Sequence, residues 1–177
     1  MRVLVVGGSG SGKSAYAERL ACRLSPQRTY LATMRNLGSE ARERIAKHRR
    51  QRAGLGFCTI ECSDTLPAPD DGTPKGVVLL DDLGNLAANA LFDDSGTMGN
   101  AQEVLDRLEQ EVLALQKGFE HMVVVGILVG AEGRPSFAST YTWVELVGSL
   151  SCRLAAQFDT VVEVAAGIPC VVKGQPL

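Results

Sequence analysis

The residues with the clearest chemistry stand near the start of the chain. Residues 7–14 match the pattern G-x-x-x-x-G-K-[ST] at each defined position. Glycines in this pattern let backbone N–H groups approach phosphate oxygens, and the helix that follows directs its positive end at the anion. Lys13 is placed to reach the β- and γ-phosphates, and Ser14 to ligate Mg²⁺. We therefore predict a phosphate-binding loop for a nucleoside triphosphate, made by Gly7, Gly8, Ser9, Gly10, Ser11, Gly12, Lys13 and Ser14.

A second acidic ligand for the metal is expected where another strand ends. The apolar run 77–80 leads directly into Asp81 and Asp82. Either carboxylate could hold Mg²⁺, directly or through water. The alternative is a pair of acids that merely face solvent, but the buried character of the run before them favours the metal site.

His48 is a candidate nucleophile within a strongly basic segment. A neutral imidazole can attack phosphorus near pH 7, and cationic neighbours would neutralise phosphate charge. Those neighbours are Arg44, Lys47, Arg49, Arg50 and Arg52. The residues alone leave open a surface histidine on a basic helix. The other histidine, His121, precedes a predicted strand and is expected to be structural or exposed.

The elements that must position these side chains alternate between strands and helices. Short apolar runs predict strands at 3–6, 29–33, 57–61, 77–80, 122–129, 159–165 and 168–173. Helical spacing predicts helices at 14–24, 39–52, 83–92, 102–117 and 139–157. Ser39 is expected to cap the helix 39–52, whose thin apolar face suggests that it is mostly solvated or covers a ligand. The last two strands, joined by Ala166-Gly167, predict a hairpin.

This alternation predicts one α/β domain over residues 1–177. We expect a three-layer P-loop NTPase fold, with a mostly parallel sheet and an antiparallel C-terminal edge hairpin. A chain of 177 residues is long enough to bury its own core.

Composition and charge narrow the class of protein further. The formal net charge of -2 gives no general attraction to nucleic acid or anionic membranes. No apolar run approaches the roughly 20 residues of a membrane span, and no signal peptide is recognised, so a cytoplasmic protein is expected. The cysteines form no paired framework and are expected to be buried in a reducing compartment: Cys22, Cys58, Cys62, Cys152 and Cys170. A metal site at Cys58 and Cys62 would need a second pair of ligands that the sequence does not offer at suitable spacing.

Further motifs, in order along nearly the whole chain, resemble those of the adenosylcobinamide kinase/adenosylcobinamide-phosphate guanylyltransferase family of cobalamin biosynthesis. The phosphate loop is widespread, but its combination with R-I-x-x-H at residues 44–48 and with the ending Ala166-Gly167-Ile168-Pro169 is specific. The other matching segments are Ala17-Glu18, Tyr30-Leu31-Ala32-Thr33, Thr59-Ile60-Glu61, Leu79-Leu80-Asp81, the set Asn89, Leu91 and Phe92, Arg153-Leu154-Ala155 and Asp159-Thr160-Val161.

The resemblance implies two reactions. A nucleoside triphosphate, ATP or GTP, phosphorylates the aminopropanol hydroxyl of adenosylcobinamide, and GMP from GTP is then transferred to that phosphate through a guanylylated histidine. It implies catalytic roles for His48 and Lys13, and contacts to nucleotide or metal from Glu61 and Asp81, with Ser14 and Asp81 as the Mg²⁺ ligands. It also implies nucleotide contacts from Ala32, Thr33, Met34, Arg49, Arg50, Gln51 and Arg52. The expected partners are a corrinoid and a nucleotide, without nucleic acid or a membrane span, and the expected assembly is a homo-oligomer, a trimer.

The chain departs from the family pattern mainly in its second half. Gly10 and Ala15 stand where arginine is usual or frequent, and Leu128 replaces the acid of an N-E-x-G segment. Residues 136–142 and Ser151-Cys152 also lack the expected polar groups. Two alternatives follow: a kinase or nucleotidyltransferase with another small substrate, and a nucleotide-binding relative with altered or lost corrinoid activity.

Overall fold

The computed structural model describes residues 1–36, 38–67, 75–129 and 137–176. Within these residues, seven strands form one sheet in the order β3-β2-β4-β5-β1-β6-β7. The neighbouring strands pair in parallel, except that β6 and β7 are antiparallel. The strands are β1 Arg2–Val6, β2 Arg28–Ala32, β3 Phe57–Glu61, β4 Val77–Asp81, β5 His121–Val125, β6 Thr160–Ala165 and β7 Ile168–Lys173. This confirms the predicted fold class.

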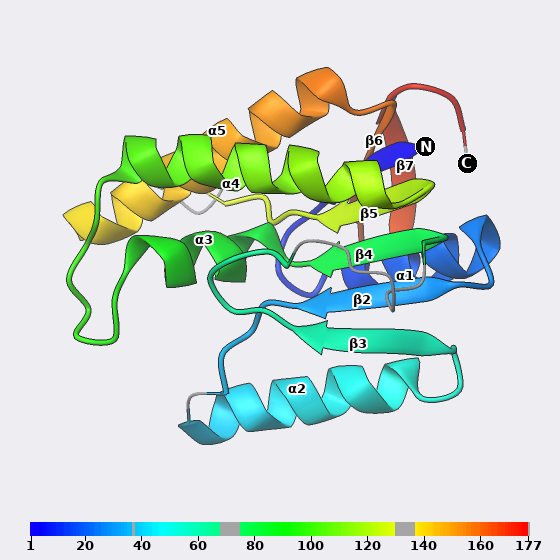
Figure 1. The fold of residues 1–177 in the computed structure, drawn as a ribbon, viewed down its shortest axis with the longest axis horizontal. Coiled ribbons are helices and arrows are strands. Elements are labelled where there is room, and N and C mark those ends of the chain that lie inside the picture. Colours follow the sequence, from blue (N-terminus) through cyan, green and yellow to red (C-terminus); the bar gives the residue numbers. More distant parts are fainter. Residues whose placement is uncertain (37, 68–74, 130–136, 177) are drawn as a thin grey trace.

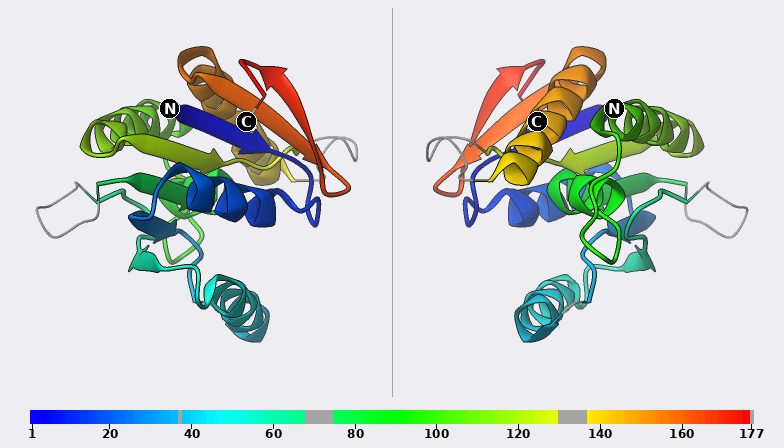
Figure 2. Two further views of the ribbon diagram at one scale, coloured as in Figure 1. Left: turned by 90° about the vertical axis from the view of Figure 1, so that its right-hand side faces the viewer. Right: turned by 90° about the vertical axis from the view of Figure 1, so that its left-hand side faces the viewer.

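Helices cover both faces of this sheet, as Figures 1 and 2 show. Helix α1 (Lys13–Leu24) packs on one face, and α3 (Leu83–Leu91), α4 (Ala101–Leu115) and α5 (Ala138–Gln157) pack on the other. Alternate residues of β1 serve the two layers: Val3 and Val5 pack towards α1, and Leu4 and Val6 towards the opposite helices. Strands buried on both faces explain the continuous apolar runs in the sequence.

Helix α2 (Gly38–Arg52) lies apart from these layers, beyond the edge strand β3 in Figure 1. Most of its described side chains are exposed or half-buried, and Arg52 is the buried exception. Because its apolar face is thin, α2 is mostly solvated, as the sequence predicted. The helix is attached at the carboxyl edge of the sheet rather than in the core.

Several predicted boundaries were wrong, each for a local reason. The strand predicted at 122–129 ends at Val125, because the next residues leave β4 and follow the phosphate loop: the Leu128 N–H donates to the Gly7 carbonyl at 3.0 Å. The helix predicted at 102–117 ends at Leu115 and tightens into the short 3₁₀ turn Gln116–Gly118. Ser39 lies inside the first turn of α2 and not at its N-cap, since the helix begins at Gly38.

The cysteines were predicted to be buried, and this was wrong for three of them. Cys58, Cys152 and Cys170 are exposed, whereas Cys62 is buried and Cys22 is half-buried. Cys58 and Cys170 lie on the edge strands β3 and β7, which have no neighbour on one side. No helix among the described residues is long and apolar enough to cross a membrane. Of the segment 136–142 that departs from the family pattern, residue 136 lies outside the described residues.

Candidate functional site

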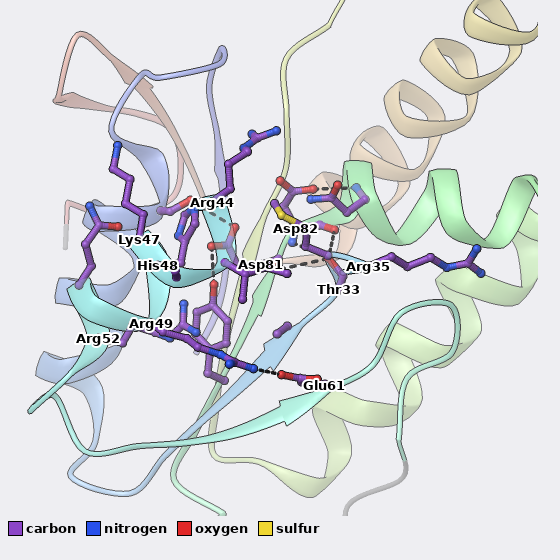
Figure 3. Close-up of a pocket in the computed structure, with 18 of the residues that line it drawn as sticks. Thr33, Arg35, Arg44, Lys47, His48, Arg49, Arg52, Glu61, Asp81 and Asp82 are labelled. Carbon is purple, nitrogen blue, oxygen red and sulfur yellow. Dashed lines mark hydrogen bonds and ion pairs between the residues drawn. The ribbon is translucent and has the colours of Figure 1, made fainter. Parts of the chain in front are cut away.

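A cavity of about 1090 Å³ opens at the carboxyl ends of the parallel strands. Its walls come from the phosphate loop after β1, the ends of β2, β3 and β4, and the inner side of α2, as Figure 3 shows. Ligands of open α/β sheets bind at this edge, because the loops and helix N-termini there direct their N–H groups outward. The cavity is large enough for a nucleotide.

The phosphate loop owes its shape to glycines at two demanding positions. Gly12 has φ 91°, in the left-handed region that favours glycine, and it directly precedes α1. Gly7 lies so close to β6 that a Cβ there would be 2.5 Å from the Val164 carbonyl oxygen. Gly7 and Gly8 shape the loop without lining the cavity, and the Lys13 Nζ donates to the Gly8 carbonyl at 3.2 Å. The Lys13 side chain is therefore folded back over the phosphate loop.

The side chains of Ser14 and Asp81 meet at the base of the cavity. The Ser14 hydroxyl donates to Asp81 Oδ1 at 3.2 Å, and the Tyr30 hydroxyl donates to Asp81 Oδ2 at 2.7 Å. Two hard oxygen donors side by side fit Mg²⁺, which takes few protein ligands and completes its shell with water and phosphate. The described residues offer no group of three or more His, Cys, Asp or Glu side chains that could hold a metal by themselves.

Asp82 lines the same cavity but has a structural partner. Its Oδ1 accepts from the Asn85 N–H at 2.8 Å, which makes Asp82 the N-cap of α3. The Thr33 hydroxyl accepts from the Asp82 N–H at 2.9 Å and so holds the turn after β4. Burial, and then the charge of Asp81, raise the pKa of the Asp82 carboxyl above its ordinary value.

His48 points from α2 into the cavity, on the side of Asp81 (Figure 3). Its Nδ1 is buried and has no hydrogen-bond partner among the described residues. Burial lowers the pKa of His48 below its ordinary value; Asp81 opposes this shift, and Arg52, Arg44 and Lys47 add to it. The imidazole is therefore neutral near pH 7, which is the form that can act as a nucleophile.

The other cations of α2 differ in their surroundings. Arg52 is only 8% exposed, and its guanidinium lies over the Tyr30 ring, 3.5 Å from the centroid. Arg49 pairs with Glu61 at the exposed rim of the cavity. Arg50 is exposed and does not line the cavity. Thus two of the three arginines that follow His48 line the cavity.

Most side chains that the sequence nominated meet at this one cavity. Those that line it are Ser9, Gly10, Ser11, Gly12, Lys13, Ser14, Ala32, Thr33, Met34, His48, Arg49, Gln51, Arg52, Glu61 and Asp81. Gly7, Gly8 and Arg50 do not line it. Leu128 is 45% exposed and does not line it either, whereas its neighbour Ile127 does.

The roles of two side chains that shape the site were not predicted from the sequence. Nothing in the local pattern around Tyr30 indicates that its hydroxyl reaches a carboxylate on the next strand. Asp82 was expected to be either a metal ligand or a solvent-facing acid, although an aspartate immediately before a helix is a recognised capping signal that would have identified its role.

Comparisons with known proteins agree along nearly the whole chain. A model of the family described as cobinamide kinase / cobinamide phosphate guanyltransferase matches residues 3–172. The bifunctional adenosylcobalamin biosynthesis protein CobU of Salmonella typhimurium is 31% identical, over 98% of this chain and 100% of its own. CobP of Pseudomonas aeruginosa, of the same description, is 31% identical over 100% of both chains, and CobU of Escherichia coli is 30% identical over 98% and 100%. Among solved structures, the flagellar accessory protein FlaH of Methanocaldococcus jannaschii aligns with 98% of this chain and 78% of its own, at a TM-score of 0.47 and 13% identity, a similarity too weak to argue from.

Proposed function

The chain belongs to the cobinamide kinase / cobinamide phosphate guanyltransferase family, and we propose that it performs both of these reactions in the cavity beneath α2. The substrates are adenosylcobinamide and a nucleoside triphosphate, and the product is adenosyl-GDP-cobinamide. The observation that carries the proposal is the meeting of a neutral, half-buried His48 with a complete phosphate loop and the Ser14–Asp81 pair in one cavity.

The kinase reaction uses the phosphate end of the cavity. The loop N–H groups and Lys13 would bind the triphosphate, and Ser14 and Asp81 would hold Mg²⁺, which would neutralise phosphate charge. The aminopropanol hydroxyl of adenosylcobinamide attacks the γ-phosphorus of ATP or GTP. A new P–O bond forms, the bond to the β-phosphate oxygen breaks, and the nucleoside diphosphate leaves while the hydroxyl proton is released.

The guanylyltransferase reaction uses His48. Its neutral ring nitrogen attacks the α-phosphorus of GTP, a P–N bond forms, and pyrophosphate leaves. A phosphate oxygen of adenosylcobinamide phosphate then attacks the same phosphorus, so that a P–O bond forms and the P–N bond breaks. Arg49 and Arg52, which line the cavity together with Arg42, Arg44 and Lys47, would offset the negative charge that accumulates in both steps.

The assembly we propose is a homotrimer that works in the cytoplasm. Every residue of the edge strand β7 is exposed, and its apolar side chains include Ile168, 70% exposed, and Val172, 64% exposed. An exposed apolar edge strand is usually covered in a native protein, and a second copy of the chain would cover it. Free thiols at the surface, such as Cys152, suit a reducing compartment.

The test is intact-protein mass spectrometry after incubation with GTP and Mg²⁺. We expect a mass gain equal to GMP in the parent chain and in His121→Ala, and no gain in His48→Ala. His121 is the matched control because it is the only other histidine and lies in β5, where its Nδ1 contacts the N-terminal amine at 3.2 Å. An adduct that persists in His48→Ala would refute the role of His48. Tight GTP binding without any adduct would favour the two alternatives, a kinase-only enzyme or a nucleotide-binding relative with altered or lost corrinoid activity.

A further inference from the structure

Most of the buried side-chain polar atoms that lack a hydrogen bond in the described part of the chain belong to α1 and α2. Among the described residues, the buried side-chain atoms that lack a hydrogen bond are Ser11 Oγ, Glu18 Oε1, His48 Nδ1, Arg52 Nε, Arg52 Nη1 and Ser151 Oγ. Glu18, on α1, and Arg52, on α2, belong to one contact, since Glu18 Oε1 lies 3.9 Å from Arg52 Nη1. Buried polar groups are normally satisfied, so a pair of opposite charges left this way calls for a functional reason.

Both members of this pair are almost completely removed from water. Glu18 is 5% exposed and Arg52 is 8% exposed. Arginine remains protonated at any physiological pH, so its burial requires a counter-charge nearby. Glu18 is the acid in salt-bridge range of Arg52 among the described residues, while the Tyr30 ring supports the flat face of the guanidinium at 3.5 Å. Glu18 thus fixes where the end of α2 can lie.

Helical spacing connects this contact to the reacting groups. Ser14 and Glu18 are four residues apart on α1, and His48 and Arg52 are four residues apart on α2, so each pair shares one helix face. The Glu18–Arg52 contact therefore lies one helical turn from His48, which points into the cavity on the side of Asp81, the partner of Ser14 (Figure 3). The other described ion pair of α2, Arg49 with Glu61, is more than 60% exposed on both sides and constrains the helix weakly.

We propose that Glu18 is a positioning residue for guanylyl transfer: its carboxylate holds Arg52 against Tyr30 and thereby holds His48 at the phosphate end of the cavity. This inference rests on the proposed role of His48. Glu18 does not line the cavity, so its effect passes through Arg52. The kinase reaction, which depends on the loop, Ser14 and Asp81, needs this contact much less.

The charge of Glu18 should make guanylyl transfer sensitive to pH. Burial raises the pKa of Glu18 to about 7; Arg52 on α2 and Arg19 on α1 oppose this shift, and Asp81 on β4 adds to it. As the pH falls below about 7, Glu18 takes up a proton and Arg52 loses its counter-charge. The pKa of His48 lies below its ordinary value, so protonation of the nucleophile itself occurs at lower pH.

The first test compares single-turnover guanylylation and kinase turnover in the parent, Glu18→Gln and Glu109→Gln. Glu109 is the matched control, since it joins α4 to Arg153 of α5 at 2.8 Å on the far face of the sheet. Glu18→Gln should slow GMP transfer to His48 by about 10- to 100-fold, as misplacement of a reacting group does. Kinase turnover should change by less than about threefold. Equal losses in both reactions, or no loss, would overturn the proposal.

Two further measurements separate positioning from general destabilisation. If Glu18 acts through Arg52, the double variant Glu18→Gln/Arg52→Met should react no more slowly than Arg52→Met alone. The fall of the rate below about pH 7 should be present in the parent and absent in Glu18→Gln. An additive double variant, or a pH profile that the substitution does not change, would argue against Glu18.

The third measurement does not require activity. Titration of the His48 NMR signal should show the pKa of His48 returning towards its ordinary value in Glu18→Gln, as the ring gains contact with water. An unchanged His48 signal would refute the positioning role. A parent chain that takes no GMP although this titration behaves as expected would instead refute the proposed function and leave Glu18 as the residue that places His48.

Discussion

The hydroxyl of Tyr30 joins β2 to the carboxylate that we assign to the metal. It donates to Asp81 Oδ2 at 2.7 Å, and the Tyr30 side chain is buried. Burial, and then the charge of Asp81, raise the pKa of Tyr30 above its ordinary value, so the hydroxyl remains a donor. The ring has separate contacts, under Arg52 and at the edge of Phe57, with centroids 6.0 Å apart in the second case. Tyr30→Phe therefore removes one hydrogen bond and keeps the packing.

The expected cost follows from the charge of the acceptor. A hydrogen bond to a charged group contributes about 1.5–3 kcal/mol, because its loss leaves a buried carboxylate oxygen without a partner. For a chain of 177 residues, each kcal/mol corresponds to about 2–4 °C in Tm, so Tyr30→Phe should lower Tm by about 3–12 °C. Calorimetry and denaturant unfolding at pH 7, without nucleotide, would measure both quantities. The half-maximal Mg²⁺ concentration of the kinase reaction should rise in parallel.

Tyr16→Phe provides the matched control. Tyr16 is also buried, on α1, but no hydrogen bond of its hydroxyl is found among the described residues. Its free energy of unfolding should change by no more than about 0.5 kcal/mol. If the two variants lost the same stability, the assignment of the Tyr30–Asp81 hydrogen bond as a stabilising contact would be refuted.

Two further substitutions test the loop and the turn after β4. Gly7→Ala should weaken GTP binding, measured by calorimetry, by about tenfold or more, because the new Cβ meets the Val164 carbonyl at 2.5 Å and overpacking costs about 1–3 kcal/mol. Gly8→Ala is the control: nothing lies within 4 Å of the added Cβ, so this variant should lose less GTP affinity. Equal losses of affinity in the two variants would contradict the steric argument. Asp82→Asn should raise the free energy of unfolding at pH 7. The pKa of Asp82 is higher in the folded state than its ordinary value of 3.8, so its charge destabilises the fold increasingly as the pH rises from 3.8 through the folded-state pKa. Asn carries no charge and can still accept from the Asn85 N–H. The difference should vanish near pH 3.8, and a variant less stable than the parent at pH 7 would contradict the argument.

The sheet could be predicted because its strands are short, apolar and bounded by polar residues. The prediction was wrong after Val125, where Ile127 and Leu128 continue the apolar run but no longer pair with β4. Local hydrophobicity does not distinguish a segment that pairs with a strand on each side from a segment that pairs on one side alone. The same limit explains Cys170, which has the character of a core residue and lies exposed on an edge strand.

The candidate site was predictable where its chemistry is encoded in contiguous residues. The phosphate loop is such a case, because the backbone of residues 7–14 and the start of α1 make the anion site together. The Tyr30–Asp81 bond and the Glu18–Arg52 contact join distant parts of the chain, so no local pattern indicates them. Arg50 illustrates a limit of motif transfer: it lies two residues from His48, and residues so spaced do not share a helix face.

The departures from the family pattern fall in two places: Gly10 and Ala15 line the phosphate end of the cavity, and the others stand in the second half of the chain. Leu128, which replaces an expected acid, is exposed and outside the lining, while its neighbour Ile127 packs beside Gly84 at the start of α3. Carboxylates still line the cavity at Asp81 and Asp82. The loop keeps Lys13 and Ser14, and Asp81 still stands beside them, whereas Leu128 leaves the cavity wall to its neighbour Ile127. The residues that we propose for nucleotide chemistry are therefore those that the chain has kept, and the loss of the acid at Leu128 does not remove a group from the described wall of the cavity.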